Sequence, residues 1–212
     1  MKKLFALVLL ILNISIISYV KGENLDLIGK VIYIDPGHGG IDPGATYKDI
    51  YEKDINLSIA LKLKKELENN GAIVYLTRYD DIDLSISTNN HKKSDLNNRV
   101  RAINNSNADL FISIHLNSYG TSWHGVQIFY DDNNSTNEVL ASIMDKNIKN
   151  LNGNRTYKKK NNLYLLKNIK IPGILVEVGF LSNENERYLL TNSKYQEKVS
   201  KSLCNGIKEY LK

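Results

Sequence analysis

The feature that most constrains the fold is a regular alternation of apolar runs with amphipathic segments. Runs rich in β-branched residues predict buried strands at 31–35, 72–77, 108–115 and 174–178. Segments with apolar residues at helical spacing predict helices at 54–70, 96–105, 137–151, 183–190 and 194–212. This alternation predicts the α/β class, with an open, mostly parallel, twisted sheet and helices on both of its faces.

The weaker patterns complete this prediction. A strand is expected at 126–130 and another short one at 163–166, and the polar stretch 78–97 is the longest expected loop. The chain has 212 residues and no internal repeat. This length suits one domain and a short extra segment, so a single domain is expected over 28–212.

The first 22 residues have the pattern of an export segment. Lys2 and Lys3 precede an apolar stretch that runs to Val20, after which the chain becomes polar. The stretch is long enough for an uncleaved membrane anchor, and Val20–Gly22 is a poor cleavage site. Residues 1–22 are therefore expected to be a signal peptide or an N-terminal anchor, and the domain is expected to act outside the cytoplasm. Membrane contact is expected through this segment alone.

Charge and cysteine usage exclude other classes of function. The net charge of +5 falls to +2 without the three lysines of residues 1–22, which is too small to indicate nucleic-acid binding. The basic run Lys158–Lys160 is typical of a solvated loop. Cys204, the single cysteine, lies at helical spacing with apolar residues, so it is expected to be a small buried residue and not a nucleophile.

Four side chains with metal-binding or acid–base chemistry are expected at one edge of the sheet. His38 follows the first predicted strand in "DPGHGGIDPGA", His115 ends "ADLFISIH", and Glu177 lies in "GILVEVGF". Glu52 precedes the first predicted helix, which starts at that same edge. Ligands bind beyond the carboxyl ends of strands in such folds. Two histidines and a carboxylate form a ligand set that zinc accepts, with a fourth position left for water.

Each of these residues also has an ordinary structural interpretation. A histidine in a glycine loop is often a turn residue, His115 could be a buried core histidine, and Glu52 suits a helix start. Glu177 is harder to explain, because an unpaired carboxylate in an apolar run is costly. Position alone suggests Glu52 as the ligand and Glu177 as the base, and does not decide between them.

Five motifs together resemble one enzyme family over residues 30–212. They are "DPGHGGIDPGA", "EKD" at 52–54, "LTR" at 76–78, "SIHLNS" at 113–118 and "VEVGFLSNENE" at 176–186. In order and spacing they resemble the zinc-dependent N-acetylmuramoyl-L-alanine amidases of the amidase-3 family. The resemblance implies one Zn²⁺ per chain held by His38, Glu52 and His115, with Glu177 as the catalytic glutamate. The implied substrate is peptidoglycan, cleaved between the lactyl group of N-acetylmuramic acid and L-alanine.

Substrate contacts are expected from residues near these motifs. Asn117 and Ser118 follow His115 and could line the cleft. Arg78 and Arg99 could either bind peptide carboxylates or anchor the structure. His124 is expected in a surface loop and His91 in solvent.

Within the family, the chain is similar to the germination-specific cortex amidases of spore-forming bacteria. It has a bare catalytic domain behind one export segment, a Trp-x-Gly pattern in "SWHGVQIFY", and "NRTYK" where the broader family has NRGVK. This similarity implies a role in cortex maturation, on the way to muramic-δ-lactam, and an activating lipoprotein partner. The alternatives are a vegetative wall amidase, a zinc carboxypeptidase or deacetylase, and a catalytically silent wall-binding or regulatory module.

Overall fold

The computed structural model describes residues 25–212 except 152 and 154, so the expected export segment lies outside the described residues. A six-stranded sheet has the order β4-β1-β5-β8-β6-β7. Its strands are β1 (Val31–Pro36), β4 (Ile73–Leu76), β5 (Leu110–Asn117), β6 (Gln127–Tyr130), β7 (Lys158–Lys159) and β8 (Gly173–Phe180). The strands β4, β1, β5 and β8 are parallel, and β6 runs antiparallel to β8. The predicted open, mostly parallel sheet is confirmed.

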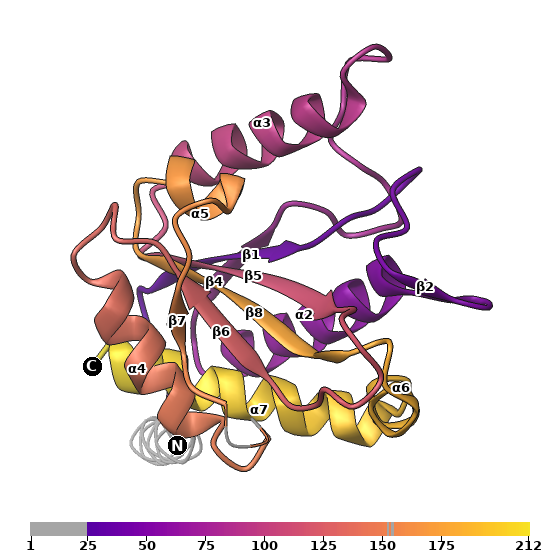
Figure 1. Cartoon of the computed structure of the whole chain (residues 1–212). Helices are drawn as coiled ribbons and strands as arrows, with labels where there is room; N and C mark the ends of the chain where they lie inside the picture. The colour runs from indigo at the N-terminus through magenta and orange to yellow at the C-terminus, as the bar shows by residue number, and fades with distance from the viewer. Residues whose placement is uncertain (1–24, 152, 154) are drawn as a thin grey trace, which may run out of the picture.

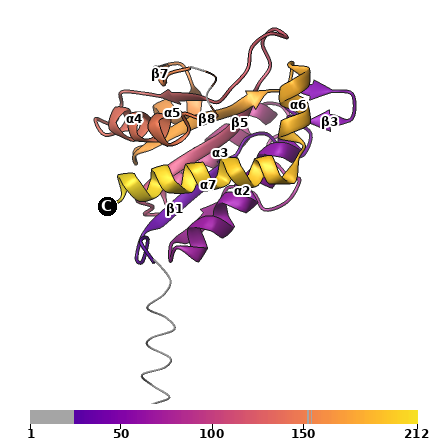
Figure 2. The ribbon, with the colours of Figure 1, turned by 90° about the horizontal axis from the view of Figure 1, so that it is seen from below.

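Helices cover both faces of this sheet (Figure 1). One face carries α2 (Glu52–Asn69), α4 (Asn137–Asn147) and α7 (Ser193–Tyr210), and the other carries α3 (His91–Asn104) and α5 (Tyr164–Asn168). Figure 2, which views the molecule from below, shows α2 and α7 side by side in front of the sheet. The short helix α6 (Glu184–Leu190) follows β8, and a small hairpin of β2 (Thr46–Tyr47) and β3 (Ile50–Tyr51) precedes α2.

Two apolar cores result from this layering. The larger one buries the predicted stripe of α2, with Ile59 and Leu63 inaccessible, against the sheet and α7. The smaller one packs Ile103 of α3 and Leu166 of α5 against Phe111 on the opposite face. Because both faces are buried, the central strands are predominantly apolar, as parallel strands usually are, and their polar residues lie toward their carboxyl ends.

Three of the predicted elements differ from the observed ones. The segment 163–166 was predicted as a strand, but α5 is helical, because one turn of helix packs the neighbouring Leu165 and Leu166 into the smaller core. The expected loop 78–97 contains the first turn of α3, which starts at His91. The helix predicted over 137–151 ends as α4 at Asn147.

Three further features of the described residues bear on the sequence analysis. Cys204 is buried as a free thiol against the larger core. The basic run was expected to be a solvated loop; it is solvated, but two of its residues form the edge strand β7, because they pair with β6. In the part of the chain that the structure describes, no helix has the length and apolar character needed to span a membrane.

Candidate active site

The carboxyl edge of the sheet brings the four predicted residues together. His38 follows β1, His115 lies near the end of β5, and Glu177 lies opposite it on β8. Glu52 is the first residue of α2 and reaches the same edge. A cleft of about 280 Å³ at this edge is lined by His38, His115 and Glu177.

The loop after β1 adopts a conformation that few sequences allow. His38 itself has a φ of 62°, in the left-handed region that side chains other than glycine rarely adopt. A Cβ at position 37 would lie 2.2 Å from the His115 ring, so only glycine permits this approach. Gly44 has a φ of 67°, and a Cβ there would lie 2.7 Å from both His38 and Glu52. The glycines therefore let the chain close tightly around the two imidazoles.

Two buried arginines donate hydrogen bonds to the backbone carbonyl groups of this loop. Arg78 donates to the carbonyl oxygens of Pro36 and Gly37, at 3.1 and 3.0 Å. Arg99 donates to the carbonyl oxygens of Pro36 and His38, at 2.8 and 2.6 Å. Arg99 also forms an ion pair with Asp35 at 2.8 Å, and both side chains are buried. We call this set of contacts the arginine clamp.

Three side chains converge on one point with the geometry of a metal centre. Glu52 Oε1 lies 3.2 Å from His38 Nε2 and 3.1 Å from His115 Nδ1. One ligand atom from each of the three residues lies within 4.8 Å of the others. Bonds of 2.0–2.1 Å in a tetrahedron place the ligand atoms about 3.3 Å apart. His38, Glu52 and His115 therefore form a site that can hold a metal ion.

Further contacts orient these ligands. The Nδ1 atom of His38 lies 2.8 Å from Asp42 Oδ2, which directs Nε2 toward the centre. The backbone N–H groups of Ala45 and Leu116 donate to Glu52 at 2.8 and 2.9 Å. Burial opposes ionisation of Glu52, but the hydrogen bonds from the two histidines hold its pKa well below the usual range.

Glu177 has a different environment. Its Oε2 atom is buried and has no hydrogen-bond partner among the described residues. Burial raises the pKa of Glu177 to about 7, and the nearby His115 opposes that rise. A carboxyl group with this pKa can both accept and return a proton near neutral pH, which is what general acid–base catalysis requires.

The remaining predicted residues lie outside this centre. Arg78 was predicted as a substrate contact or an anchor, and its place in the arginine clamp, with 1% of its surface exposed, makes it an anchor. Asn117 is partly buried and Ser118 is exposed, and neither is among the described residues that line the cleft. Their predicted substrate contacts remain predictions. His124 is exposed, as expected, whereas His91 lies 3.2 Å from Asp83 and is not simply solvated.

Sequence reasoning missed two residues that support the ligands. Asp42 lies four positions after His38 in the same glycine-rich motif, and this spacing was its only signal. Asn56 is buried one turn after Glu52 on α2 and donates to Glu52 Oε1 and to the Gly37 carbonyl oxygen. Its polarity on an otherwise apolar helix face could have indicated such a role.

Comparison with known proteins is consistent with this geometry. Residues 32–209 match the family model described as Amidase_3, N-acetylmuramoyl-L-alanine amidase. The chain belongs to this family. It is 44% identical over 198 residues to the germination-specific N-acetylmuramoyl-L-alanine amidase of Bacillus subtilis, covering 90% of this chain and 84% of that relative.

Other members of the amidase-3 family are also similar. The sporulation-specific N-acetylmuramoyl-L-alanine amidase of Bacillus subtilis is 33% identical over 178 residues, covering 84% of this chain and 67% of that protein. The CwlD amidase of Clostridioides difficile, solved in complex with the GerS lipoprotein, is 42% identical with a TM-score of 0.82, covering 86% of this chain and 98% of that one. These matches confirm the predicted family and its finer resemblance to germination-specific amidases.

Proposed function

We propose that this protein is a zinc-dependent N-acetylmuramoyl-L-alanine amidase that hydrolyses the amide between the lactyl group of N-acetylmuramic acid and L-alanine. The observation that carries the proposal is the pairing of two groups in one cleft. A set of two imidazoles and a carboxylate lies beside Glu177, whose buried Oε2 atom lacks a partner. An amide resists hydrolysis, and this pairing offers both an ion site and a proton carrier.

The donor set supports zinc as the ion. Two histidines and one carboxylate at tetrahedral spacing leave a fourth position open, which is typical of catalytic zinc sites. When bound, zinc lowers the pKa of water and polarises a carbonyl group.

The protein's own groups then carry out the proton transfers. Glu177 accepts the proton of the attacking water at Oε2 and delivers a proton to the alanine nitrogen as the C–N bond breaks. Its pKa of about 7 favours both directions of transfer. The arginine clamp keeps His38 beside Glu52 and His115 in the ion site, because it fixes the carbonyl groups of three consecutive loop residues.

The relatives support a finer assignment within this activity. The germination-specific and sporulation-specific names of two relatives favour action on spore cortex peptidoglycan, outside the cytoplasm. Removal of the peptide would leave muramic acid ready for conversion to muramic-δ-lactam by another enzyme. The complex of the CwlD relative with a lipoprotein favours a lipoprotein partner for this chain as well.

Activity on purified peptidoglycan tests the proposal. The chain from Glu23 onward is loaded with zinc, and soluble products are analysed by mass spectrometry, with Glu177→Ala as the control. We expect free stem peptides that begin with alanine from the wild type alone. Released acetate or free terminal amino acids would instead indicate a deacetylase or a carboxypeptidase.

A second arm separates the remaining alternatives. If the zinc-loaded chain is inactive alone, a spore lipoprotein is added, and activity on that addition supports the partner assignment. No release in either arm contradicts the amidase proposal and favours a silent wall-binding module. Unchanged muramic-δ-lactam in spores that lack the protein would contradict the cortex role and favour a vegetative wall amidase.

A further inference from the structure

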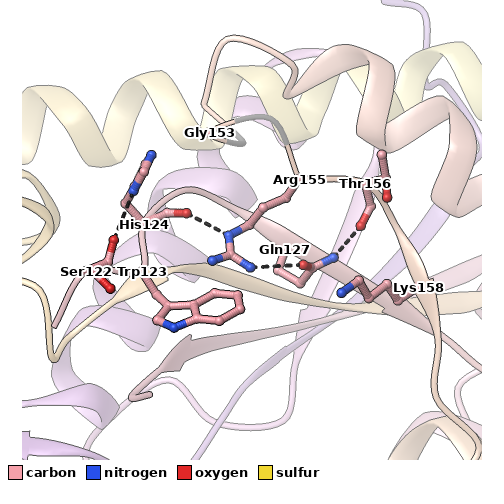
Figure 3. A pocket seen from close by; sticks show the side chains of 8 residues that line it. All are labelled: Ser122, Trp123, His124, Gln127, Gly153, Arg155, Thr156 and Lys158. Atoms are coloured by element: carbon pink, nitrogen blue, oxygen red, sulfur yellow. Dashed lines mark hydrogen bonds between the residues drawn. The ribbon is translucent and has the colours of Figure 1, made fainter. Parts of the chain in front are cut away.

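A second cavity lies next to the catalytic centre, on the β6 and β7 side of the sheet. It has a volume of about 470 Å³, and its lining includes Trp123, Gln127, Arg155 and Lys158. We call it the Arg155 pocket. Figure 3 shows these side chains, with the Arg155 guanidinium between the Trp123 indole and Gln127. The catalytic steps described above use none of these groups.

Arg155 is held rigidly in this pocket. Its guanidinium carbon lies 4.6 Å from the centre of the Trp123 ring and 4.5 Å from that of Phe180, so the cation is stacked against two aromatic rings. Its Nε donates to the carbonyl oxygen of His124 at 2.6 Å, and its Nη1 to Gln127 Oε1 at 3.4 Å. A guanidinium fixed in this way loses little conformational entropy when it binds an anion.

The Arg155 guanidinium forms no direct ion pair within the described residues; burial lowers the pKa of Arg155, and the buried Glu186 carboxylate opposes this from beyond ion-pair distance. Within residues 25–212, leaving aside 152 and 154, no carboxylate lies within 4.0 Å of its nitrogens, and Nη2 makes no hydrogen bond. Arg99 in the main cleft differs, because Asp35 and Asp95 both pair with it. Lys158 adds a second, exposed cation to the Arg155 pocket.

Gln127, which lines the Arg155 pocket, is the side chain that lies between this pocket and Glu177. Gln127 on β6 is the direct partner of Glu177 on β8 in the antiparallel register. Directly paired residues of antiparallel strands have Cα atoms about 4.5–5.5 Å apart and side chains on the same face. Gln127 in turn accepts a hydrogen bond from Arg155 Nη1 at 3.4 Å, so a single side chain connects the strand position of the base to the guanidinium.

We propose that the Arg155 pocket binds the free α-carboxylate of the residue that follows L-alanine in the stem peptide. This inference rests on the proposed amidase function. In stem peptides that residue is D-glutamate linked through its side-chain carboxyl, so its α-carboxyl group is free or amidated. The sugar side of the scissile amide offers neutral hydroxyl and acetamido groups, which do not match an unpaired guanidinium. The peptide therefore extends toward β6 and β7, and the glycan toward α3 and α5.

A matched pair of substrates tests this assignment. Zinc-loaded enzyme is given muropeptides whose D-glutamate α-carboxyl is either free or amidated, and kcat/KM is measured for each. We expect wild type to prefer the free acid. We expect Arg155→Gln to lose about tenfold to hundredfold on the free acid, as for a lost hydrogen bond to a charged group, and to be unchanged on the amide. Arg155→Lys should recover part of the loss.

Lys201→Gln is the control, since it removes the same charge from an exposed position of α7, on the other face of the sheet. Equal losses on both substrates in Arg155→Gln, or no preference in wild type, would overturn the proposal. Binding of the free and amidated stem peptides to zinc-loaded Glu177→Gln, measured by calorimetry, needs no turnover. If neither substrate is cleaved, the amidase function fails, and this titration still decides the pocket: preference for the free acid that is lost with Arg155→Gln supports it, and equal affinities overturn it.

Discussion

The ion pair between Arg99 and Asp35 is expected to be the most sensitive point of the fold. Asp35 is 1% exposed and accepts hydrogen bonds from Arg99, Thr77 and Ser113, at 2.8, 2.7 and 2.7 Å. Arg99→Met keeps an unbranched apolar stem but removes the charge and the donors of the side chain. The substitution leaves a buried carboxylate without a cation and leaves the carbonyl oxygen of His38 without the Arg99 donor.

The size of the effect follows from this geometry. Removing one partner of a buried ion pair costs about 3–5 kcal/mol, because the other charge stays buried. Against a total stability of about 5–15 kcal/mol, this is a large fraction. In Asp35→Asn/Arg99→Met neither member of the buried ion pair stays charged, so the double variant should lose less than the sum of the single variants, by about 1–3 kcal/mol.

The pH dependence of the free energy of unfolding tests the same reasoning, because its direction can be worked out. Burial alone would raise the pKa of Asp35, but Arg99 and the two hydroxyl donors hold it below the usual value. The ionised form thus adds stability above about pH 4, the pKa of an unfolded aspartate, and this contribution is lost as the pH falls through the lower folded pKa. In Arg99→Met the carboxyl can take up a proton, so the stability difference from wild type should shrink as the pH falls.

Urea unfolding followed by far-UV circular dichroism at pH 7 and pH 5 measures both effects. Arg101→Met is the matched control, because Arg101 is exposed two residues later on α3, and it should change stability by less than about 0.5 kcal/mol. If Arg99→Met loses less than about 1 kcal/mol at pH 7, or loses the same amount at both pH values, the buried-charge reasoning is refuted.

Four further predictions concern the catalytic centre. Glu177→Ala should retain zinc, measured by mass spectrometry of bound metal, and lose about 10²–10⁴ in rate; loss of the metal would make Glu177 a ligand. Gly37→Ala should weaken zinc binding about tenfold or more in chelator competition, because the new Cβ displaces the His115 ring. Asp42→Asn should weaken zinc binding about 10–100-fold, since it removes the charged partner of His38 Nδ1, and unchanged affinity would contradict that role. Zinc at 100 times its dissociation constant should stabilise wild type by about 2.7 kcal/mol, and EDTA should abolish the resulting rise in melting temperature.

The layering of the fold could be predicted from the sequence because long apolar patterns determine it. The apolar stripe of α2 extends over several helical turns, and the apolar runs of β5 and β8 extend over several residues in a row. Each pattern is long enough for the sequence to show whether the segment is a helix or a strand. The helix α5 has five residues, which is too short for a helical repeat to distinguish it from a strand. The first turn of α3 is polar, and its start depends on contacts such as that of Asp95 with the backbone N–H of Leu84.

The metal-binding residues could be found for a different reason. Parallel strands end at one edge, so histidines and a glutamate at strand ends were expected to meet. The supporting residues gave weaker signals, because Asp42 and Asn56 act through contacts that only the folded loop creates. Position left the roles of Glu52 and Glu177 open. Their environments differ in the structure, since one carboxylate is held by histidines and N–H groups and the other retains an unpartnered oxygen, and this difference supports the proposed roles.

Stability and metal binding are linked in this protein through the loop that carries His38. A side chain at a φ of 62° costs about 1–3 kcal/mol, and such a conformation persists only where its surroundings enforce it. The arginine clamp enforces it, because relaxing the loop would withdraw carbonyl oxygens from two buried cations. The ion pair of Arg99 with Asp35 in turn ties the clamp to the central sheet. The loop therefore keeps His38 in place before any metal binds. Metal binding then does not have to order the loop, so less of its favourable free energy is offset by the loss of conformational entropy.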